Sequence, residues 1–413
     1  MRKISRHVFL LCVILLLSSP IVSASEAKLR FAVGWGSQPD TFIPLIEEFT
    51  KRTGIEIEPI VIPGSYHNAI MVQYASGVLP DLYMVDLVNF AYMVHIGAVL
   101  RLEEYYVRDQ IDFNKYLPIF DSSRVNGVLY GFPAEGGGYR TDAMFINRDL
   151  FLEGGLAYPG PGIQDALTYD EVLTIARKLT RMRTGEEVPY QFGVWASLPT
   201  RWLTFVPGAG AKIFNEDKSE ILVNSPEMIN LLRFFQDMKT NYAVFGGTFE
   251  SGNVAMDIRF RAQGAVWVDA IGDRFDWSVA PFPAGPAGSI GTTRMNSLVI
   301  SSNTQYPEEA WEFIKFLMSE EVQQQNAKTG RAVALRSAAV SYLQSSGPPY
   351  DLRPFIEGPA VDWSTLLPPP GGVWPTAAVN NILNQTMSGQ IAPESAVEQL
   401  EQLLQVMLED VRL

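Results

Sequence analysis

The sequence predicts an α/β protein whose two lobes are built from discontinuous parts of the chain and joined by a hinge. Apolar strands and amphipathic helices alternate in the first third, a pattern typical of a parallel sheet with helices on its faces. Two segments rich in glycine and proline, at 131–140 and 283–293, each lead into an apolar strand, as expected of a crossing between lobes. A chain of 413 residues is long enough for two or three domains, or for one two-lobed unit.

The first 24 residues read as a secretory signal peptide. Arg2, Lys3 and Arg6 precede an apolar run at 8–17, and a small-residue cleavage pattern ends at Ala24. The apolar run is about half the ~20 residues that a membrane-spanning helix needs. Leu11, rather than a small residue, precedes the single cysteine, Cys12, so we expect no lipid anchor. The sequence therefore predicts an exported, soluble protein.

Charge and composition exclude several classes of function. Removal of the signal peptide takes away three positive charges and no negative ones, which changes the formal net charge from −13 to −16. Such acidity argues against nucleic acid and anionic membranes as partners. The mature chain would have no cysteine, and its two histidines, His67 and His95, lack metal-ligand spacing. We therefore expect no disulfide, metal site or cofactor.

The first third predicts a parallel β-α-β-α-β unit. Its expected strands are 29–35, 55–62 and 80–86, and its expected helices are 39–52 and a segment that ends near 76. Ligands of such sheets bind beyond the carboxyl ends of the strands. This rule points to 35–38, which includes Trp35 and Gln38, to Ser65 and Tyr66, and to 86–89.

The segment 130–151 is expected to connect the lobes. Pro133 and three consecutive glycines at 136–138 predict irregular backbone, and the apolar run from Ala143 predicts a buried strand. A loop held between rigid elements is also a common place for a ligand. We therefore expect this segment to border the binding site.

The remainder of the chain predicts helices with clear start signals and several short strands. Thr168 and Glu171 form a capping box, and Ser225 with Pro226 begins another helix. The other expected helices are 307–318, a segment from 319, 376–387 and 394–408, and the expected strands are 264–269, 277–282 and 297–301.

Several short motifs occur in an order and spacing that cover nearly the whole mature chain. They are FTKRTGI at 49–55, ASG at 75–77 with PD at 80–81, YGFP at 130–133, FINRDLF at 145–151, TYDE at 168–171, NSPE at 224–227, PEEAWEFI at 307–314 and MSG at 387–389. Together they resemble the extracellular solute-binding proteins of ABC transporters, in the sugar-binding family that includes maltose-binding protein. Each motif alone has little specificity.

The resemblance implies a type II periplasmic-binding-protein fold. The first lobe would comprise 25–135 and 290–335, and the second 136–289 and 336–413, with a third crossing near 331–337. It also implies a monomer, periplasmic or extracellular, that closes by hinge motion on one solute and delivers it to the permease subunits of an ABC importer. A sugar or oligosaccharide is the expected solute.

Sugars offer apolar ring faces to aromatic side chains and hydroxyl groups to charged and polar ones. The resemblance places Trp267 and Asp269, at the end of an expected strand, where relatives often contact the sugar. The aromatic candidates are Trp35, Tyr66, Trp195, Trp202, Trp267 and Trp374, and the polar candidates are Gln38, Asp86, Glu135, Tyr139, Arg140, Asp269, Arg294 and Asn296.

Three alternatives stay open. Asp86, Glu135 and Asp269 would also suit a polyamine, which is a cation. Glu135 and Asp269, on opposite lobes, would suit a secreted glycosidase, which needs two carboxylates across the scissile bond. Arginines at 140, 201 and 294, if they face the cleft, would instead favour a uronate or another acidic sugar.

Overall fold

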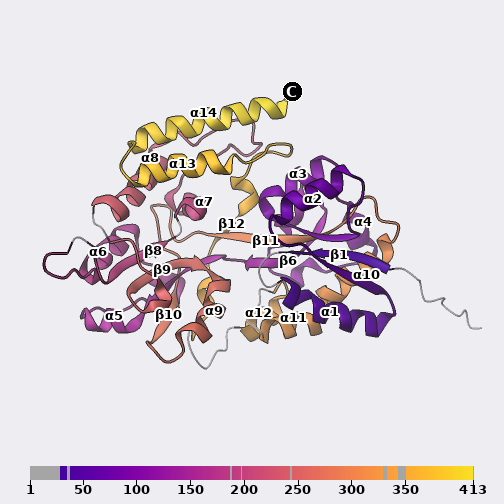
Figure 1. Ribbon diagram of the computed structural model, residues 1–413, viewed down its shortest axis with the longest axis horizontal. Helices are drawn as coiled ribbons and strands as arrows, with labels where there is room; N and C mark the ends of the chain where they lie inside the picture. The colour runs from indigo at the N-terminus through magenta and orange to yellow at the C-terminus, as the bar shows by residue number, and fades with distance from the viewer. Residues whose placement is uncertain are drawn as a thin grey trace, which may run out of the picture.

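A computed structural model describes residues 28–34, 38–186, 188–196, 198–241, 244–328, 333–342 and 350–412. The signal-peptide prediction lies outside these residues. Two α/β lobes lie side by side, each built around its own sheet, and strand β11 runs from one lobe into the other (Figure 1). Each sheet has helices on both faces, as the alternation of strands and helices predicts.

The first lobe contains a six-stranded mixed sheet. Its order is β12-β11-β3-β1-β2, with β6 beside β11 at an edge. The parallel strands β1, β2 and β3 carry the expected unit, and β11 runs antiparallel to β3 and β6. The strands are β1 Lys28–Val33, β2 Glu56–Val61, β3 Leu82–Val85, β6 Gly131–Gly138, β11 Gly291–Ile300 and β12 Ala360–Asp362, with the separate pair β4 Arg124–Val125 and β5 Val128–Leu129.

Seven helices pack on this sheet in the described part of the chain. Those expected near 39–52, before 76, at 307–318 and from 319 are confirmed, whereas the helices at 87–95, 103–108 and 336–342 were not predicted. They are α1 Gln38–Thr53, α2 Tyr66–Ala75, α3 Leu87–His95, α4 Glu103–Arg108, α10 Pro307–Met318, α11 Glu320–Lys328 and α12 Arg336–Tyr342.

The second lobe contains a four-stranded sheet in the order β10-β7-β9-β8. The capping box at Thr168 and the cap at Ser225 are confirmed, because each side chain accepts a hydrogen bond from the third residue of its helix. The strands are β7 Asp142–Asn147, β8 Phe192–Ala196, β9 Val254–Phe260 and β10 Trp277–Ala280, and the helices are α5 Arg148–Glu153, α6 Tyr169–Leu179, α7 Leu198–Ala209, α8 Pro226–Gln236, α9 Arg261–Ile271, α13 Thr376–Met387 and α14 Pro393–Arg412.

Two expectations about local structure are wrong. The segment with Pro133 and the three glycines is not a loop but the edge strand β6, where a proline costs no ladder hydrogen bond. Its register against β11 shifts twice, and Ala134 and Gly137 are the extra residues at the bulges. The run 264–269 is not a strand but lies in helix α9, and the strand is the preceding segment, β9.

Three segments connect the lobes, and they lie next to one another. Thr141 donates its N–H to Thr292 O at 2.9 Å, and Gly291 donates its N–H to Pro359 O at 2.9 Å. The third connection comes later than 331–337, because Ala339 packs in the core of the first lobe and Leu352 packs in the second lobe.

Arg140 ties these three segments together. Its side chain has no exposed surface, and it donates hydrogen bonds to Pro354 O (3.1 Å), Ser289 O (3.1 Å), Pro359 O (2.7 Å) and the Ser289 hydroxyl (3.0 Å). Burial lowers the pKa of Arg140 to about 10, and at neutral pH the guanidinium still carries its charge. The three connections therefore share one buried charged residue.

Candidate ligand-binding site

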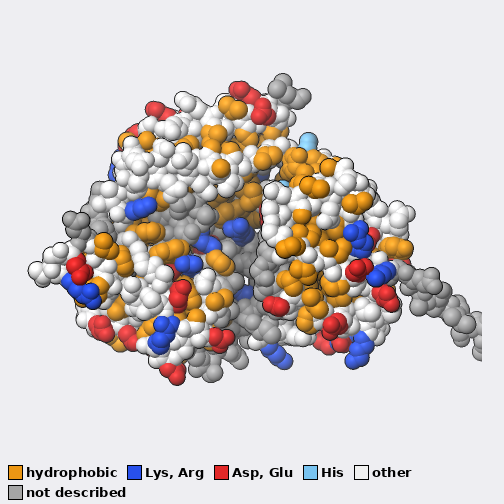
Figure 2. Space-filling view, viewed as in Figure 1, with side chains coloured by type: hydrophobic (Ala, Val, Ile, Leu, Met, Phe, Trp, Pro, Cys, Tyr) orange, Lys and Arg blue, Asp and Glu red, His pale blue; other side chains and the backbone are white. Residues whose placement is uncertain are grey.

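Strand ends from both lobes meet at the furrow between them. In the first lobe Ser297 of β11 pairs with Val85, the last residue of β3, so Arg294 and Asn296 lie beyond the carboxyl end of β3. In the second lobe the carboxyl ends of β8 and β9 lie beside the amino end of β7, because Asp142 pairs with Phe260. Basic side chains gather beside the furrow (Figure 2).

Asp86 follows β3 and is the N-cap of α3. Its carboxylate accepts from the backbone N–H of Asn89 at 2.9 Å and from the Asn89 side-chain amide at 2.9 and 2.8 Å. The side chain is partly buried, at the edge where the sheet topology predicts a ligand. Asp86 therefore fixes the start of a helix at this edge and keeps an acceptor there.

Arg294 lies between groups of both lobes. Its guanidinium carbon is 5.1 Å from the ring centroid of Trp363, which begins the short helix Trp363–Leu366. Burial is the largest cause that lowers the pKa of Arg294, and the positive charge of Arg201 lowers it further, while Asp142 and Asp86 oppose the shift. The Arg294 charge thus interacts with Asp86 in the first lobe and with Asp142 and Arg201 in the second.

Arg201 and Asp142 form an ion pair at the amino end of strand β7 in the second sheet. Asp142 is 1% exposed, and it also accepts a hydrogen bond from the Thr204 hydroxyl at 3.3 Å. The Arg201 guanidinium lies 4.3 Å from the ring centroid of Phe260. The pair is therefore held from several sides, and Arg201 keeps 11% of its side chain exposed.

A second buried carboxyl lies on β9, one of the two inner strands of the same sheet. Asp257 has no exposed surface, and Arg259 donates to its Oδ1 at 3.1 Å. Burial raises the pKa of Asp257 to about 8, although Arg259 acts in the opposite direction. Arg259 also lies 3.7 Å over the ring of Trp195, and Phe245 is nearly parallel to that ring at 6.1 Å. Arg259 thus covers one face of Trp195.

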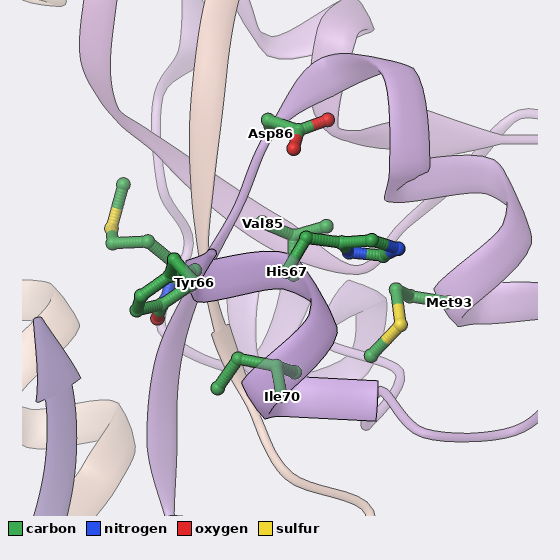
Figure 3. Close-up of a pocket in the computed structure, with 7 residues that line it drawn as sticks. Tyr66, His67, Ile70, Val85, Asp86 and Met93 are labelled. Carbon is green, nitrogen blue, oxygen red and sulfur yellow. The ribbon is translucent and has the colours of Figure 1, made fainter. Parts of the chain in front are cut away.

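Tyr66 is a structural residue, not a stacking platform. It is 5% exposed, donates its hydroxyl to Ala32 O at 2.9 Å and accepts the Met84 N–H at 3.0 Å, which ties β1 to β3. A side chain at Gly34 would fall 1.8 Å from its ring, so only glycine fits there. Figure 3 shows the small hollow beside it, where the ring of His67 lies near Met93.

That hollow has no room for a water-sized sphere. It is lined by Tyr66, His67, Ile70, Met84, Val85, Asp86 and Met93. Asp86 lies at its edge in Figure 3. The hollow is therefore a packing feature of the first lobe and not a place for a sugar ring.

The prediction that Trp267 and Asp269 contact the ligand from a strand end rests on the wrong element. Trp267 lies on α9, is 1% exposed and packs against Phe145 and Phe249 at centroid distances of 5.0 and 4.7 Å. Asp269 is exposed on the same helix. In this structure Trp267 has no free face for stacking, because it belongs to the core of the second lobe.

Arg140 and Trp202 are also buried. Arg140 uses its donors on the lobe connections, as described above, and Trp202 is 2% exposed in the second-lobe core. Trp374 is partly buried, with its ring centroid 6.3 Å from that of Trp202. Tyr139 is partly buried against the first-lobe core, and its carbonyl accepts a hydrogen bond from Thr293 at 2.9 Å.

Some predicted residues fall outside the described part of the chain. Trp35 is one of them, and for Gln38 and Glu135 the structure describes the backbone, in α1 and β6, but not the side chain. Asn296 is partly buried two residues after Arg294 on β11. Its backbone lies opposite that of Glu135.

Sequence reasoning missed Asp142, Asp257, Arg259 and Trp363. The alternating run VAMDIRF at 254–260 could have indicated Asp257 and Arg259. It predicts a strand and places these two residues two positions apart on it, so that they share one face. Asp142 stands directly before the apolar run of β7. Trp363 lies in a segment without periodicity, and no pattern points to it.

Guanidinium groups, carboxylates and indole rings are the groups that hold a polyhydroxylated ring by hydrogen bonds and stacking. Within the described ranges, no group of three or more histidine, cysteine, aspartate or glutamate side chains is arranged to hold a metal ion. Nor does any helix in those ranges have the length and apolarity needed to span a bilayer.

The chain is similar to known binding proteins. A family model described as bacterial extracellular solute-binding protein matches residues 35–324. A binding protein of Brucella abortus (strain 2308) is 23% identical over 310 residues, which cover 67% of this chain and 69% of the relative.

Solved structures share the fold. An ABC substrate-binding protein from Listeria monocytogenes in complex with cycloalternan superposes with a TM-score of 0.77 at 21% identity, over 93% of this chain and 99% of its own. The sugar-binding protein MalE from Xanthomonas citri gives a TM-score of 0.77 at 19% identity, over 94% and 98%. At these identities the likeness shows a two-lobed binding-protein fold.

Proposed function

Because the chain belongs to the bacterial extracellular solute-binding proteins, we propose that it is the substrate-binding component of an ABC importer and that it captures a sugar or oligosaccharide between its lobes. Solved structures with this fold include proteins in complex with cycloalternan, with tagatose and with acarbose. The protein would act outside the cytoplasm after export. Its partner would be the permease of the importer.

The convergence of Arg294, Trp363, Asp86 and the Arg201–Asp142 pair at the furrow carries this proposal. These groups come from both lobes and from β11, the strand that runs between them. A solute that contacts both sets of groups gains contacts in the closed arrangement that it lacks in the open one. Binding therefore stabilises the closed form, which the permease would recognise.

The protein would bind its solute without breaking bonds. A glycosidase needs two carboxylates that face each other across the scissile bond, at about 5–10 Å. Asp269, one of the two carboxylates considered for that role, is exposed on helix α9 and does not end a strand. The family consists of binding proteins, which agrees with capture rather than catalysis.

Thermal unfolding of the mature protein in the presence of D-glucose, D-mannose, maltose, maltotriose, D-galacturonate and spermidine tests the proposal. A ligand that binds only the native state raises the melting temperature by mass action. We expect at least one saccharide to do so, and we expect Trp363→Ala to weaken its binding at least tenfold. Trp363 is 3% exposed and supports the Arg294 guanidinium rather than contacting the solute itself, so Trp363→Phe, which keeps an aromatic ring beside that guanidinium, separates loss of this support from loss of folding.

A shift with spermidine alone would replace the sugar by a polyamine on the same fold. Release of reducing sugar from maltotriose would contradict simple binding. No shift with any of these solutes would refute the proposal.

A further inference from the structure

Arg294 is a positive charge without a hydrogen-bond acceptor among the described residues. Arg201 and Arg259, in contrast, each donate to a buried carboxyl, that of Asp142 and that of Asp257. Arg294 is partly buried against Trp363, at 5.1 Å from the ring centroid. A guanidinium has five N–H donors, and those of Arg294 are not among the fully buried polar atoms that lack a partner, so they remain open to solvent. A bound group with acceptor oxygens would take the place of that water.

The furrow is locally positive although the protein as a whole is acidic. Arg201 is close enough to Arg294 for the two charges to oppose each other, which the lowered pKa of Arg294 reflects after burial itself. Burial raises the pKa of Asp257 to about 8, so this carboxyl is mostly protonated at neutral pH and offsets little of the Arg259 charge. The formal net charge of the chain is −13.

We infer that the solute is a saccharide with a carboxylate, a hexuronate, and that Arg294 holds the carboxylate. This inference rests on the proposed function and names the substrate class of the same site. Contact with the indole of Trp363 orients the guanidinium and uses none of its N–H donors. The planar guanidinium matches the two oxygens of a carboxylate with paired hydrogen bonds.

A single negative charge fits the surroundings better than a phosphate. Asp86 acts on Arg294 from the first lobe and Asp142 from the second, and Asp142 is 1% exposed with its charge paired to Arg201. A phosphate ester carries nearly two negative charges at neutral pH and would be repelled more strongly by these carboxylates. A polyamine would be repelled by Arg294 and Arg201.

Calorimetric titration of the mature protein with matched solutes tests this inference. The solutes are D-galacturonate, D-glucuronate and digalacturonate, their neutral counterparts D-galactose, D-glucose and galactobiose, and D-glucose 6-phosphate. We expect at least one uronate to bind at least tenfold more tightly than its neutral counterpart. Added salt should weaken the uronate and not the neutral sugar, because only the former pairs charges.

Variants then test the residue. Arg294→Gln should weaken the uronate tenfold to a hundredfold and change the neutral counterpart less than threefold, while Arg294→Lys should restore part of the loss. Arg52→Gln is the matched control, since this exposed arginine on α1 pairs with Glu48 and Glu321 and should leave uronate binding unchanged.

The outcomes separate the two proposals. If a neutral sugar binds and its uronate does not, the carboxylate inference is overturned and sugar capture stands. Binding of glucose 6-phosphate without any uronate would also overturn it. If the Arg294→Gln protein binds the uronate unchanged, Arg294 does not hold the carboxylate. If neither neutral nor acidic saccharides bind, the proposed function itself fails.

Discussion

Replacement of Trp267 by alanine should destabilise the protein without a direct effect on ligand binding. The side chain is 1% exposed and packs between Phe145 and Phe249 in the core of the second lobe. Truncation of a buried aromatic residue to alanine costs roughly 3–5 kcal/mol of unfolding free energy, because contacts are lost and a cavity remains. Native domains are stable by only about 5–15 kcal/mol, so this is a large fraction.

Urea unfolding of the Trp267→Ala protein, followed by circular dichroism, gives this free energy by linear extrapolation. Trp267→Phe is the control. The indole N–H of Trp267 has no acceptor among the described residues, so the phenylalanine variant loses volume but no hydrogen bond, and it should cost less than about half as much. The reasoning is refuted if Trp267→Ala leaves the unfolding free energy within about 1 kcal/mol of wild type and abolishes binding of a saccharide.

Two further predictions concern buried charges. Arg140→Lys should lower the unfolding free energy by roughly 3–5 kcal/mol, as expected when a buried charged network is broken, because an ammonium cannot reach all four acceptors. Urea unfolding measures this free energy. A loss below ~1 kcal/mol would contradict the role of Arg140. Because the folded-state pKa of Asp257 is raised to about 8, its contribution to stability is fully present below pH 4 and is lost as the pH rises toward 8. Between pH 5 and pH 8 the unfolding free energy of the wild type should therefore fall by on the order of 4 kcal/mol more than that of Asp257→Asn. Unfolding free energies that change in parallel with pH in the two proteins would contradict this expectation.

Local signals in the sequence predict much of the fold. The capping residues Thr168 and Ser225 specify helix starts by their own hydrogen bonds, and these were located correctly. Glycine and proline were poorer guides. At Pro133 the missing N–H matters only if a neighbouring strand needs it, and no propensity reveals that β6 is an edge strand. The apolar run at Trp267 fits a strand or a helix equally well, since periodicity cannot decide over six residues.

Prediction of the site failed at residues whose role depends on tertiary contacts. Asp86 was selected because it follows an expected strand, where topology points to a ligand, whereas Arg294, which lies within β11, was selected for its residue type. Arg140 has the same residue type and a similar glycine-rich context, yet it serves the backbone carbonyls of Ser289, Pro354 and Pro359. These acceptors lie at least 149 positions away in the sequence, and no local pattern indicates them.

The buried guanidinium of Arg140 has a mechanical consequence. It hydrogen-bonds to all three connecting segments between the lobes, so these segments cannot bend independently where Arg140 holds them. Rotation of one lobe against the other must then occur on either side of this point, with all three connections turning through a common angle. We therefore expect the lobes to rotate about one common axis. Distances measured at several points between the lobes should then change together when a ligand is added.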